Sequence, residues 1–457
     1  MTHHAHDAQA SPAHPQPQAA NRVGYASPRE AMQAPPEEFV YVAALHTGTG
    51  IEEPDFLAVV DVNPASDEYG RIVHRAPMPY KGDELHHYGW QVCSSACHTT
   101  LRRENLIVPG FGSSRLHVID VSDPRRPGVA KVIEPEEVRR KTRLTAPHTI
   151  HCMPGDVVVV SMLGDENGDS PGGLAVLDAK TFDILGRWEN GNGAAGVEFM
   201  YDFWYQPRKN VMVTSEWGAP NTFRPGFKLE DVTAGKYGRR IHFWDLAERR
   251  VVSSIDLGEE GMIPLEVRWQ HDPDSETGFV GAALSSAIWR WHRDGGEWKA
   301  DKVIQVESKE VEGWPFPVPG LITDLVLSMD DRFLYFSDWL HGDLRQYDVS
   351  DPSHPRLTGR LWLGGDLGEP PVGGRKLDAG PQMLQLSMDG RRLYVTNSLY
   401  STWDNQFYPG MRSWMLKIDC DPEGGMALDE RFFTDFGVAR GHEIHLPGGD
   451  CTTEIFP

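Results

Sequence analysis

The chain has 457 residues, of which 40% are hydrophobic, so it is long enough to bury a large core. Its formal net charge is −22, and no run rich in Lys or Arg is present. This charge argues against binding to nucleic acids or anionic membranes, and it favours a small neutral or cationic substrate. No stretch approaches the roughly 18 consecutive apolar residues of a transmembrane helix, so we expect no membrane span.

Residues 1–24 are rich in His, Pro, Ala and Gln and lack the apolar core of a secretory signal. They predict a disordered tail ahead of a single domain over 25–457. The five cysteines are an odd and small number for this length, which argues against a disulfide framework and for a reducing compartment. We therefore expect a cytoplasmic protein, with the periplasm left open.

Along the chain, the clearest internal signal is a recurring pair of strands around a tight turn. Windows of equal length align without gaps at 147–161, 201–215, 323–337 and 382–396, and looser copies start at 85, 265 and 441. The seven starting points lie roughly 60 residues apart, and such recurrence of a strand-rich unit is typical of propeller blades. The sequence therefore predicts an all-β fold, a seven-bladed β-propeller.

The two ends of the chain predict how the propeller closes. The last window starts at 441, too near Pro457 to complete a blade, while strand-like segments at 39–45 and 56–62 have no partners in the same count. We expect these N-terminal strands to pair with the C-terminal blade, because closure removes exposed sheet edges. A pair of β-sandwich domains is the alternative, although no low-complexity linker separates two halves.

The inner strand of each propeller blade lines the central channel, so equivalent window positions form a ring. Six of the seven residues at the second window position are polar or ionisable, where a buried strand would favour Val or Leu. These positions hold His86 (with His87 beside it), His148, Asp202, Glu266, Asp324, Met383 and His442. A polar channel without chemistry is the alternative to a functional ring.

Several histidines are candidate metal ligands at this ring. Neutral imidazole suits copper, zinc, iron and nickel, and His86, His87, His148 and His442 come from windows that the propeller would bring together. His151 stands at the fifth window position, where it is either a further metal ligand or a packing residue between blades.

The acidic members of the ring, Asp202, Glu266 and Asp324, are expected to orient the imidazoles or to carry protons. Cys93 is four residues before Cys97, a wider spacing than the CxxC of redox dithiols. Its thiol is a candidate catalytic group that would ligate a soft metal or form a mixed disulfide with a thiol substrate. A pair of inert buried thiols is the alternative.

Five long strings give the chain a specific family resemblance. They are DELHHYGWQVCSS at 83–95, YDFWYQPR at 201–208, FLYFSDWLHGDLRQYDVSDP at 333–352, SLYSTWDNQFYP at 398–409 and PGGDC at 447–451. The chain resembles the selenium-binding protein family, whose bacterial and animal members include methanethiol oxidases. The resemblance implies a propeller, copper on the histidines named above, and oxidation of methanethiol by O2 and water to formaldehyde, hydrogen sulfide and hydrogen peroxide.

The chain departs from this family at two places. Gly70 stands where animal members carry a selenium-linked cysteine, so covalent selenium is not expected there, and an extra residue separates Cys93 from Cys97. Two alternatives to the oxidase stay open: a non-catalytic scaffold that binds selenium or metal, and a hydrolase with a divalent cation on the acidic residues. The expected partners are a small thiol and O2, and the sequence gives no indication of oligomeric state.

Overall fold

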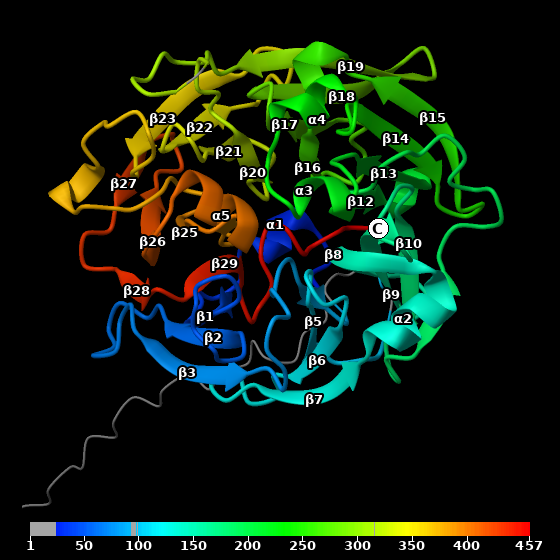
Figure 1. The fold of residues 1–457 in the computed structure, drawn as a ribbon, viewed down its shortest axis with the longest axis horizontal. Coiled ribbons are helices and arrows are strands. Elements are labelled where there is room, and N and C mark those ends of the chain that lie inside the picture. The colour runs from blue at the N-terminus through cyan, green and yellow to red at the C-terminus, as the bar shows by residue number, and fades with distance from the viewer. Residues whose placement is uncertain (1–23, 93–96, 98, 315) are drawn as a thin grey trace, which may run out of the picture.

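The computed structural model describes residues 24–92, 97, 99–314 and 316–457, whose strands form seven antiparallel sheets around one axis (Figure 1). Each sheet has four strands, except one that carries a fifth. The prediction of a seven-bladed β-propeller is confirmed. The alternative of two β-sandwich domains is wrong, because the sheets follow one another around a single ring.

Each blade runs from an inner strand at the axis to an outer strand at the rim. From the inner to the outer strand, the first four blades are β29 (Arg440–His445), β1 (Phe39–Leu45), β2 (Phe56–Asp61), β3 (Ile72–Pro77); β4 (Gly89–Trp90), β5 (Asn105–Pro109), β6 (Leu116–Asp120), β7 (Gly128–Ile133); β8 (Leu144–Met153), β9 (Val157–Asp165), β10 (Gly173–Asp178), β11 (Ile184–Arg187); and β12 (Phe203–Gln206), β13 (Val211–Ser215), β14 (Arg240–Asp245), β15 (Arg250–Asp256). The other three are β16 (Pro264–Trp269), β17 (Gly278–Ala282), β18 (Ala287–Asp294), β19 (Glu297–Gln305); β20 (Ile322–Leu327), β21 (Phe333–Asp338), β22 (Asp343–Asp348), β23 (Arg356–Trp362); and β24 (Leu384–Leu386), β25 (Arg392–Thr396), β26 (Ser413–Cys420), β27 (Met426–Leu428), with β28 (Thr434–Gly437) beside β26.

The repeat windows mark the inner strands of the blades. The windows at 147–161, 201–215, 323–337 and 382–396 contain the innermost hairpins β8–β9, β12–β13, β20–β21 and β24–β25. The looser windows lead into β4, β16 and β29. The second window position therefore lies at or just before the inner strand in every blade, and this places its polar side chains around one channel.

Closure follows the predicted scheme, in which the two ends of the chain share one blade. β1 pairs with β2 on one side and with β29 on the other, where Tyr41 is aligned with His445 and Val42 with Ile444. The inner strand of this blade thus comes from the C-terminal end and its three outer strands from the N-terminal end. This pairing covers the edge of β1 that the N-terminal strands alone would leave open.

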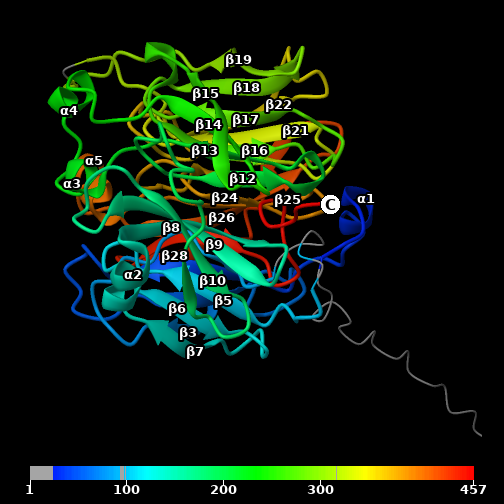
Figure 2. The same ribbon diagram turned by 90° about the vertical axis from the view of Figure 1, so that its right-hand side faces the viewer.

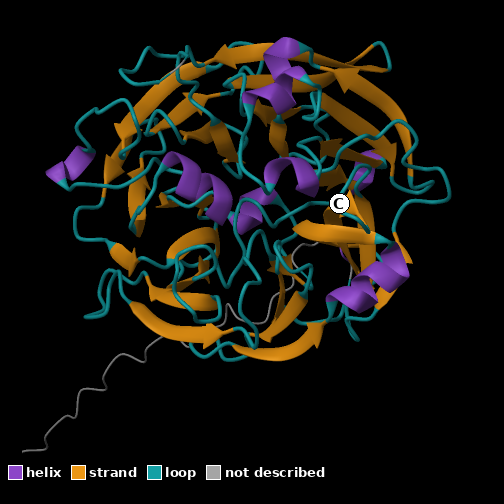
Figure 3. Ribbon diagram, viewed as in Figure 1, coloured by secondary structure: helices purple, strands orange, loops and turns teal. Residues whose placement is uncertain are grey.

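Large aromatic side chains fill the spaces between blades, as expected for stacked sheets. Trp90, Trp244, Trp269, Trp291 and Trp339 are among the largest fully buried residues. Short helices lie outside the sheets (Figure 3): α1 (Pro28–Ala31), α2 (Pro135–Thr142), α3 (Pro220–Phe223), α4 (Leu229–Thr233) and α5 (Ser401–Phe407). Figure 2 shows α3, α4 and α5 on one face of the disc, and α1 with the C-terminus on the other. None of the helices in the described ranges is long and apolar enough to cross a membrane.

Two sequence expectations concern cysteine positions. A disulfide joins Cys97 to Cys152, a bond that the sequence did not lead us to expect, since the cysteine number argued against a disulfide framework; Cys420 and Cys451 are free and buried. Gly70 has a φ of +80°, and a Cβ there would lie 3.2 Å from the backbone N and O of Phe433. This turn accommodates glycine and would strain a cysteine. Cys93 and nearly all of the predicted tail lie outside the described residues.

Candidate metal centre

Three histidines from two ends of the chain meet at the centre of the ring. His86 and His87 lie in the irregular segment before β4, and His442 lies on β29; one ring nitrogen of each lies within 4.8 Å of the others. We call these three residues the histidine cluster. The ring of His148, on β8, is centred 4.0 Å from that of His87 and 4.8 Å from that of His86. The structure therefore brings four of the predicted ligands together.

The hydrogen bonds of these rings show which nitrogen atoms remain available to bind a metal ion. His442 Nδ1 lies 2.7 Å from the carbonyl oxygen of Ser398, and His148 Nδ1 lies 3.0 Å from Thr149 Oγ1. A carbonyl only accepts, so Nδ1 of His442 carries the proton and its Nε2 presents a lone pair. His86 Nδ1 and the Nε2 atoms of His87, His148 and His442 are buried and have no hydrogen-bond partner among the residues that the structure describes. Such an arrangement suits a metal ligand, whose other ring nitrogen is held by the protein.

Burial keeps these imidazoles neutral. It lowers the pKa of His148 to about 3 and that of His442 to about 4. The pKa values of His86 and His87 also lie well below the usual value, because burial and neighbouring imidazoles disfavour the charged form. Neutral rings offer lone pairs at pH 7, so this buried group could bind a metal ion.

An aromatic wall covers one side of the histidine cluster. Phe111 stacks on His86 with ring centroids 4.6 Å apart and on Phe223 with centroids 5.4 Å apart. Trp217 stacks on Phe223 at 4.0 Å, and Tyr400 packs edge-on against Trp217 at 5.7 Å. All of these rings are buried. The wall excludes water from this side, which strengthens electrostatic interactions at the cluster.

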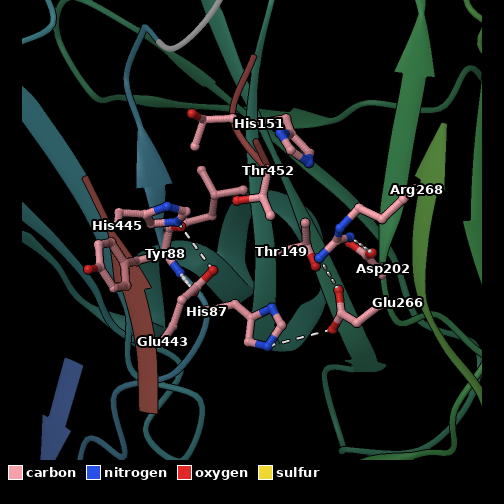
Figure 4. A pocket seen from close by; sticks show the side chains of 12 residues that line it. His87, Tyr88, Thr149, His151, Asp202, Glu266, Arg268, Glu443, His445 and Thr452 are labelled. Atoms are coloured by element: carbon pink, nitrogen blue, oxygen red, sulfur yellow. Dashed lines mark hydrogen bonds and ion pairs between the residues drawn. The ribbon is translucent and has the colours of Figure 1, made fainter. Parts of the chain in front are cut away.

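A polar pocket opens on the other side of the cluster, at His87 (Figure 4). Its lining comes from the inner strands of several blades and from the C-terminal segment. The residues are His87, Tyr88, Thr149, Ile150, His151, Asp202, Glu266, Arg268, Glu443, His445, Thr452 and Thr453. Of the histidine cluster, His87 alone lines this pocket, so a small molecule held there would approach the cluster at His87.

Two of the predicted acidic residues tie neighbouring blades together. Asp202 accepts hydrogen bonds from the backbone N–H of Phe203 and, on the next inner strand, of Val267, both at 2.8 Å. Asp324 repeats this arrangement with the N–H groups of Leu325 and Leu384, both at 2.7 Å. Both carboxylates therefore hold inner strands in register, a role that the sequence pattern did not predict for them.

Glu266 differs from these two acids because its carboxylate is not used between strands. Its Oε2 accepts from Arg268 at 2.9 Å. Its Oε1 lies 3.7 Å from His87 Nε2 and has no hydrogen-bond partner in the described part of the chain. Burial, followed by the charge of Asp202, holds the pKa of Glu266 well above its usual value. Glu266 is therefore able to hold a proton next to His87 at neutral pH.

Arg268 is a central residue that the sequence pattern did not predict. It donates to Asp202 at 2.8 Å and to Glu266 at 2.9 Å, and it lies 3.6 Å from Asp324. One buried guanidinium thus links all three predicted acids. The signal in the sequence is its spacing of two from Glu266, which directs both side chains to the same face of a strand.

A second group that the pattern did not predict holds the backbone that follows the paired histidines. Glu443 accepts a hydrogen bond from the N–H of Tyr88, and His445 Nε2 donates to the carbonyl oxygen of Tyr88 at 2.7 Å. His445 Nδ1 lies 2.8 Å from Asp450. Although burial alone would lower it, the carboxylates of Asp450 and Glu443 raise the pKa of His445 to about 10. The charged ring can donate from both nitrogens and fixes this segment.

His151 lies apart from the histidine cluster. Its ring packs edge-on against Phe203 and Trp204, with centroids 5.2 and 5.1 Å away, and it borders the polar pocket. Burial lowers its pKa to about 4. Of the two interpretations left open by the sequence, these contacts favour packing between blades.

Comparison with known proteins gives matches over almost the whole chain. The 56kDa selenium binding protein family matches residues 19–457. The methanethiol oxidases of Xenopus laevis and Homo sapiens are 50% and 49% identical to this chain, over 95% of its length and 98% of theirs. The crystal structure of a hypothetical selenium-binding protein from Sulfolobus tokodaii matches with a TM-score of 0.92 and 48% identity, over 95% of this chain and 99% of that one. The chain therefore belongs to the selenium-binding protein family.

Proposed function

We propose that this chain is a copper-dependent methanethiol oxidase, which converts methanethiol, O2 and water to formaldehyde, hydrogen sulfide and hydrogen peroxide. The observation that carries the proposal is the histidine cluster with His148 beside it. One buried nitrogen of each ring has no hydrogen-bond partner among the described residues. Neutral imidazoles are suitable copper ligands. The activity is the one named for relatives about half identical to this chain over nearly its full length.

Each group at the site has a separate task in this proposal. Bound copper would supply a soft site for the thiolate and the redox chemistry with O2. The polar pocket binds the substrate next to His87, and Glu266 accepts or returns a proton there, with Arg268 holding its other oxygen. The aromatic wall keeps water from the far side of the cluster. Asp202 and Asp324 position the inner strands, and His151 supports the pocket from its packing site.

The contacts argue against one of the two alternatives, the hydrolase, and do not separate the other from the oxidase. A hydrolase would need a divalent cation on the acidic residues, but the Arg268 guanidinium already lies between Asp202, Glu266 and Asp324. A non-catalytic metal-binding scaffold would need the same histidine cluster and differs from the oxidase only in turnover. A cytoplasmic location stays a prediction, and the Cys97–Cys152 disulfide instead favours an oxidising compartment.

The test replaces His442 with Ala in full-length protein whose tail histidines (His3, His4, His6 and His14) are changed to Ala. Copper content, methanethiol-dependent O2 uptake and peroxide release are measured in this parent and in His442→Ala. Because one ligand of a buried site is lost, activity should fall by at least about 100-fold, at or beyond the upper end of the losses seen when a supporting residue is removed. Copper should be lost while cooperative unfolding persists.

His354→Ala is the matched control, because this histidine side chain is 83% exposed and belongs to neither the cluster nor the pocket. It should keep full copper and full turnover. Full copper with full turnover in His442→Ala would overturn the proposal. Stoichiometric copper in the parent without any thiol oxidation would leave the scaffold as the function.

A further inference from the structure

A second buried group with ligand-forming side chains lies in the sixth blade, outside the channel site. Asp338 ends β21, Asp343 begins β22, and His341 lies in the turn between them. One possible ligand atom of each lies within 4.8 Å of the others, and all three residues are fully buried. Neither the histidine cluster nor the polar pocket includes any of them.

Like His442, His341 donates to a backbone carbonyl through one ring nitrogen, but here the donor is Nε2 instead of Nδ1. Its Nε2 lies 2.9 Å from the carbonyl oxygen of Val318, and a carbonyl only accepts, so Nε2 carries the proton. Nδ1 then presents a lone pair, and this buried atom has no hydrogen-bond partner among the described residues. Such a fixed tautomer is what a metal-binding histidine requires.

The two carboxylates each keep an oxygen that no arginine uses. Arg345 Nε lies 2.9 Å from Asp338 Oδ2 and 2.8 Å from Asp343 Oδ2, and Arg360 Nε lies 2.6 Å from the same Asp343 oxygen. Within the described part of the chain, both oxygens of Asp338 and the Oδ1 of Asp343 are buried and have no hydrogen-bond partner. The two carboxylates are fully buried and lie close together, so their charges repel each other, and a cation between them would relieve that repulsion.

We propose that Asp338, His341 and Asp343 form a second metal site, which takes a divalent cation of the Zn²⁺ or Mn²⁺ class. Two carboxylate oxygens and one imidazole make a harder donor set than the four imidazoles of the channel site. Arg345 and Arg360 both donate to Asp343 Oδ2 and orient that carboxylate, as partners of ligating groups do in metal sites, and Arg345 also lies 2.9 Å from Asp338 Oδ2. The site would brace the turn between β21 and β22, and it goes beyond the proposed oxidase.

The experiment measures Zn²⁺ stoichiometry and affinity by calorimetry on full-length protein with the four tail histidines changed to Ala. The parent should bind two equivalents, one at each site. Asp338→Asn keeps the size of the side chain, removes a repelling charge and should therefore fold; it should bind one equivalent. His442→Ala should also bind one, and the double variant none. Zn²⁺ should raise the unfolding temperature of His442→Ala but not that of the double variant.

Asp61→Asn is the matched control, because Asp61 is a buried carboxylate whose two oxygens accept from Asn63 and Ser66. It should bind two equivalents like the parent. The proposal is overturned if Asp338→Asn also binds two equivalents with unchanged affinity. It is equally overturned if the parent binds a single equivalent that His442→Ala removes, since Asp338 and Asp343 would then be only a repelling pair of acids.

Discussion

Residues at one repeat position take different tasks because their surroundings differ. Asp202 and Asp324 both reach across to a backbone N–H of the following blade. Glu266 stands at the same position. The equivalent backbone N–H on the following blade is that of Leu325, and it already donates to Asp324. Its longer side chain instead lies between Arg268 and His87. Of the three acids, Glu266 is therefore the one with an oxygen free to move a proton.

His151→Phe tests the packing role of that residue through the pH dependence of stability. The usual pKa of 6.5 falls to about 4 in the folded protein, so below pH 6.5 the unfolded chain binds the extra proton. Stability is thus complete above pH 6.5 and falls as the pH drops toward 4, by up to about 3 kcal/mol. Phe removes this loss and keeps the contacts with Phe203 and Trp204.

Urea unfolding of metal-free protein at several pH values measures the difference between wild type and His151→Phe. The two should have similar stability near neutral pH and diverge in acid, where the variant is the more stable. Copper content and turnover should stay close to those of wild type. If the free energies of unfolding of the two proteins changed with pH in parallel, the buried ring of His151 would not be neutral. Loss of copper in the variant would instead indicate that His151 is a metal ligand.

At the scale of the elements, β29 connects closure of the ring to the chemistry. It pairs with β1, carries His442, and supplies Glu443 and His445, which hold the backbone of Tyr88 just after His86 and His87. The geometry of the histidine cluster therefore depends on a strand pairing between the two ends of the chain. We expect damage to that pairing to weaken metal binding as well as the fold.

Val42→Pro tests this dependence. Val42 is aligned with Ala58 of β2 and with Ile444 of β29, so a proline there disturbs a strand that is paired on both sides. The free energy of unfolding should fall by about 3 kcal/mol or more. Copper affinity should fall as well, and both are measured by urea unfolding and metal titration.

Val73→Pro is the comparison variant, because Val73 lies on the outer strand β3 and is 39% exposed. The register between β2 and β3 shifts at this residue. It should cost less than about 1 kcal/mol, since outer strands tolerate proline, and it should leave copper binding unchanged. Equal effects of the two prolines would mean that the pairing of β1 with β29 has no special part in the site.

At the scale of the molecule, the disulfide links the second and third blades. Cys152 lies on β8 one residue after His151, and its partner Cys97 follows β4, so the bond connects the segments that carry His86, His87 and His148. It closes a separation of 55 residues along the chain. A crosslink of this span mainly restricts the unfolded chain, and it acts on the whole fold rather than on one contact.

Replacing both Cys97 and Cys152 with Ala should lower the free energy of unfolding by about 4 kcal/mol, the chain-entropy value for a loop of this length. Urea unfolding with and without a reducing agent measures the effect. Reductant should destabilise wild type and leave the double variant unchanged, and Cys420→Ala should respond to reductant as wild type does, because Cys420 is free. A wild type that ignores reductant would contradict the disulfide.

The sequence by itself determined the blade number, the inner strands and the closure. Pairs of strands whose side chains alternate between two faces recur along the chain, and each copy forms the innermost hairpin of a blade. The window position of a residue therefore predicts its distance from the axis. From the repeat pattern alone, the second position accordingly predicts that His86, His148 and His442 lie together at the channel.

Only the tertiary structure decided what each residue contacts. Arg268 was not identified because its partners come from three different blades, and the tasks of Glu443 and His445 depend on the backbone of Tyr88, more than 350 residues away. The Cys97–Cys152 bond likewise joins positions that spacing rules do not connect. Repeat symmetry determines the backbone position of each residue in its blade. Hydrogen bonds, ion pairs and burial between blades depend instead on the side chains of neighbouring blades, which differ from one repeat to the next and are not part of a periodic pattern.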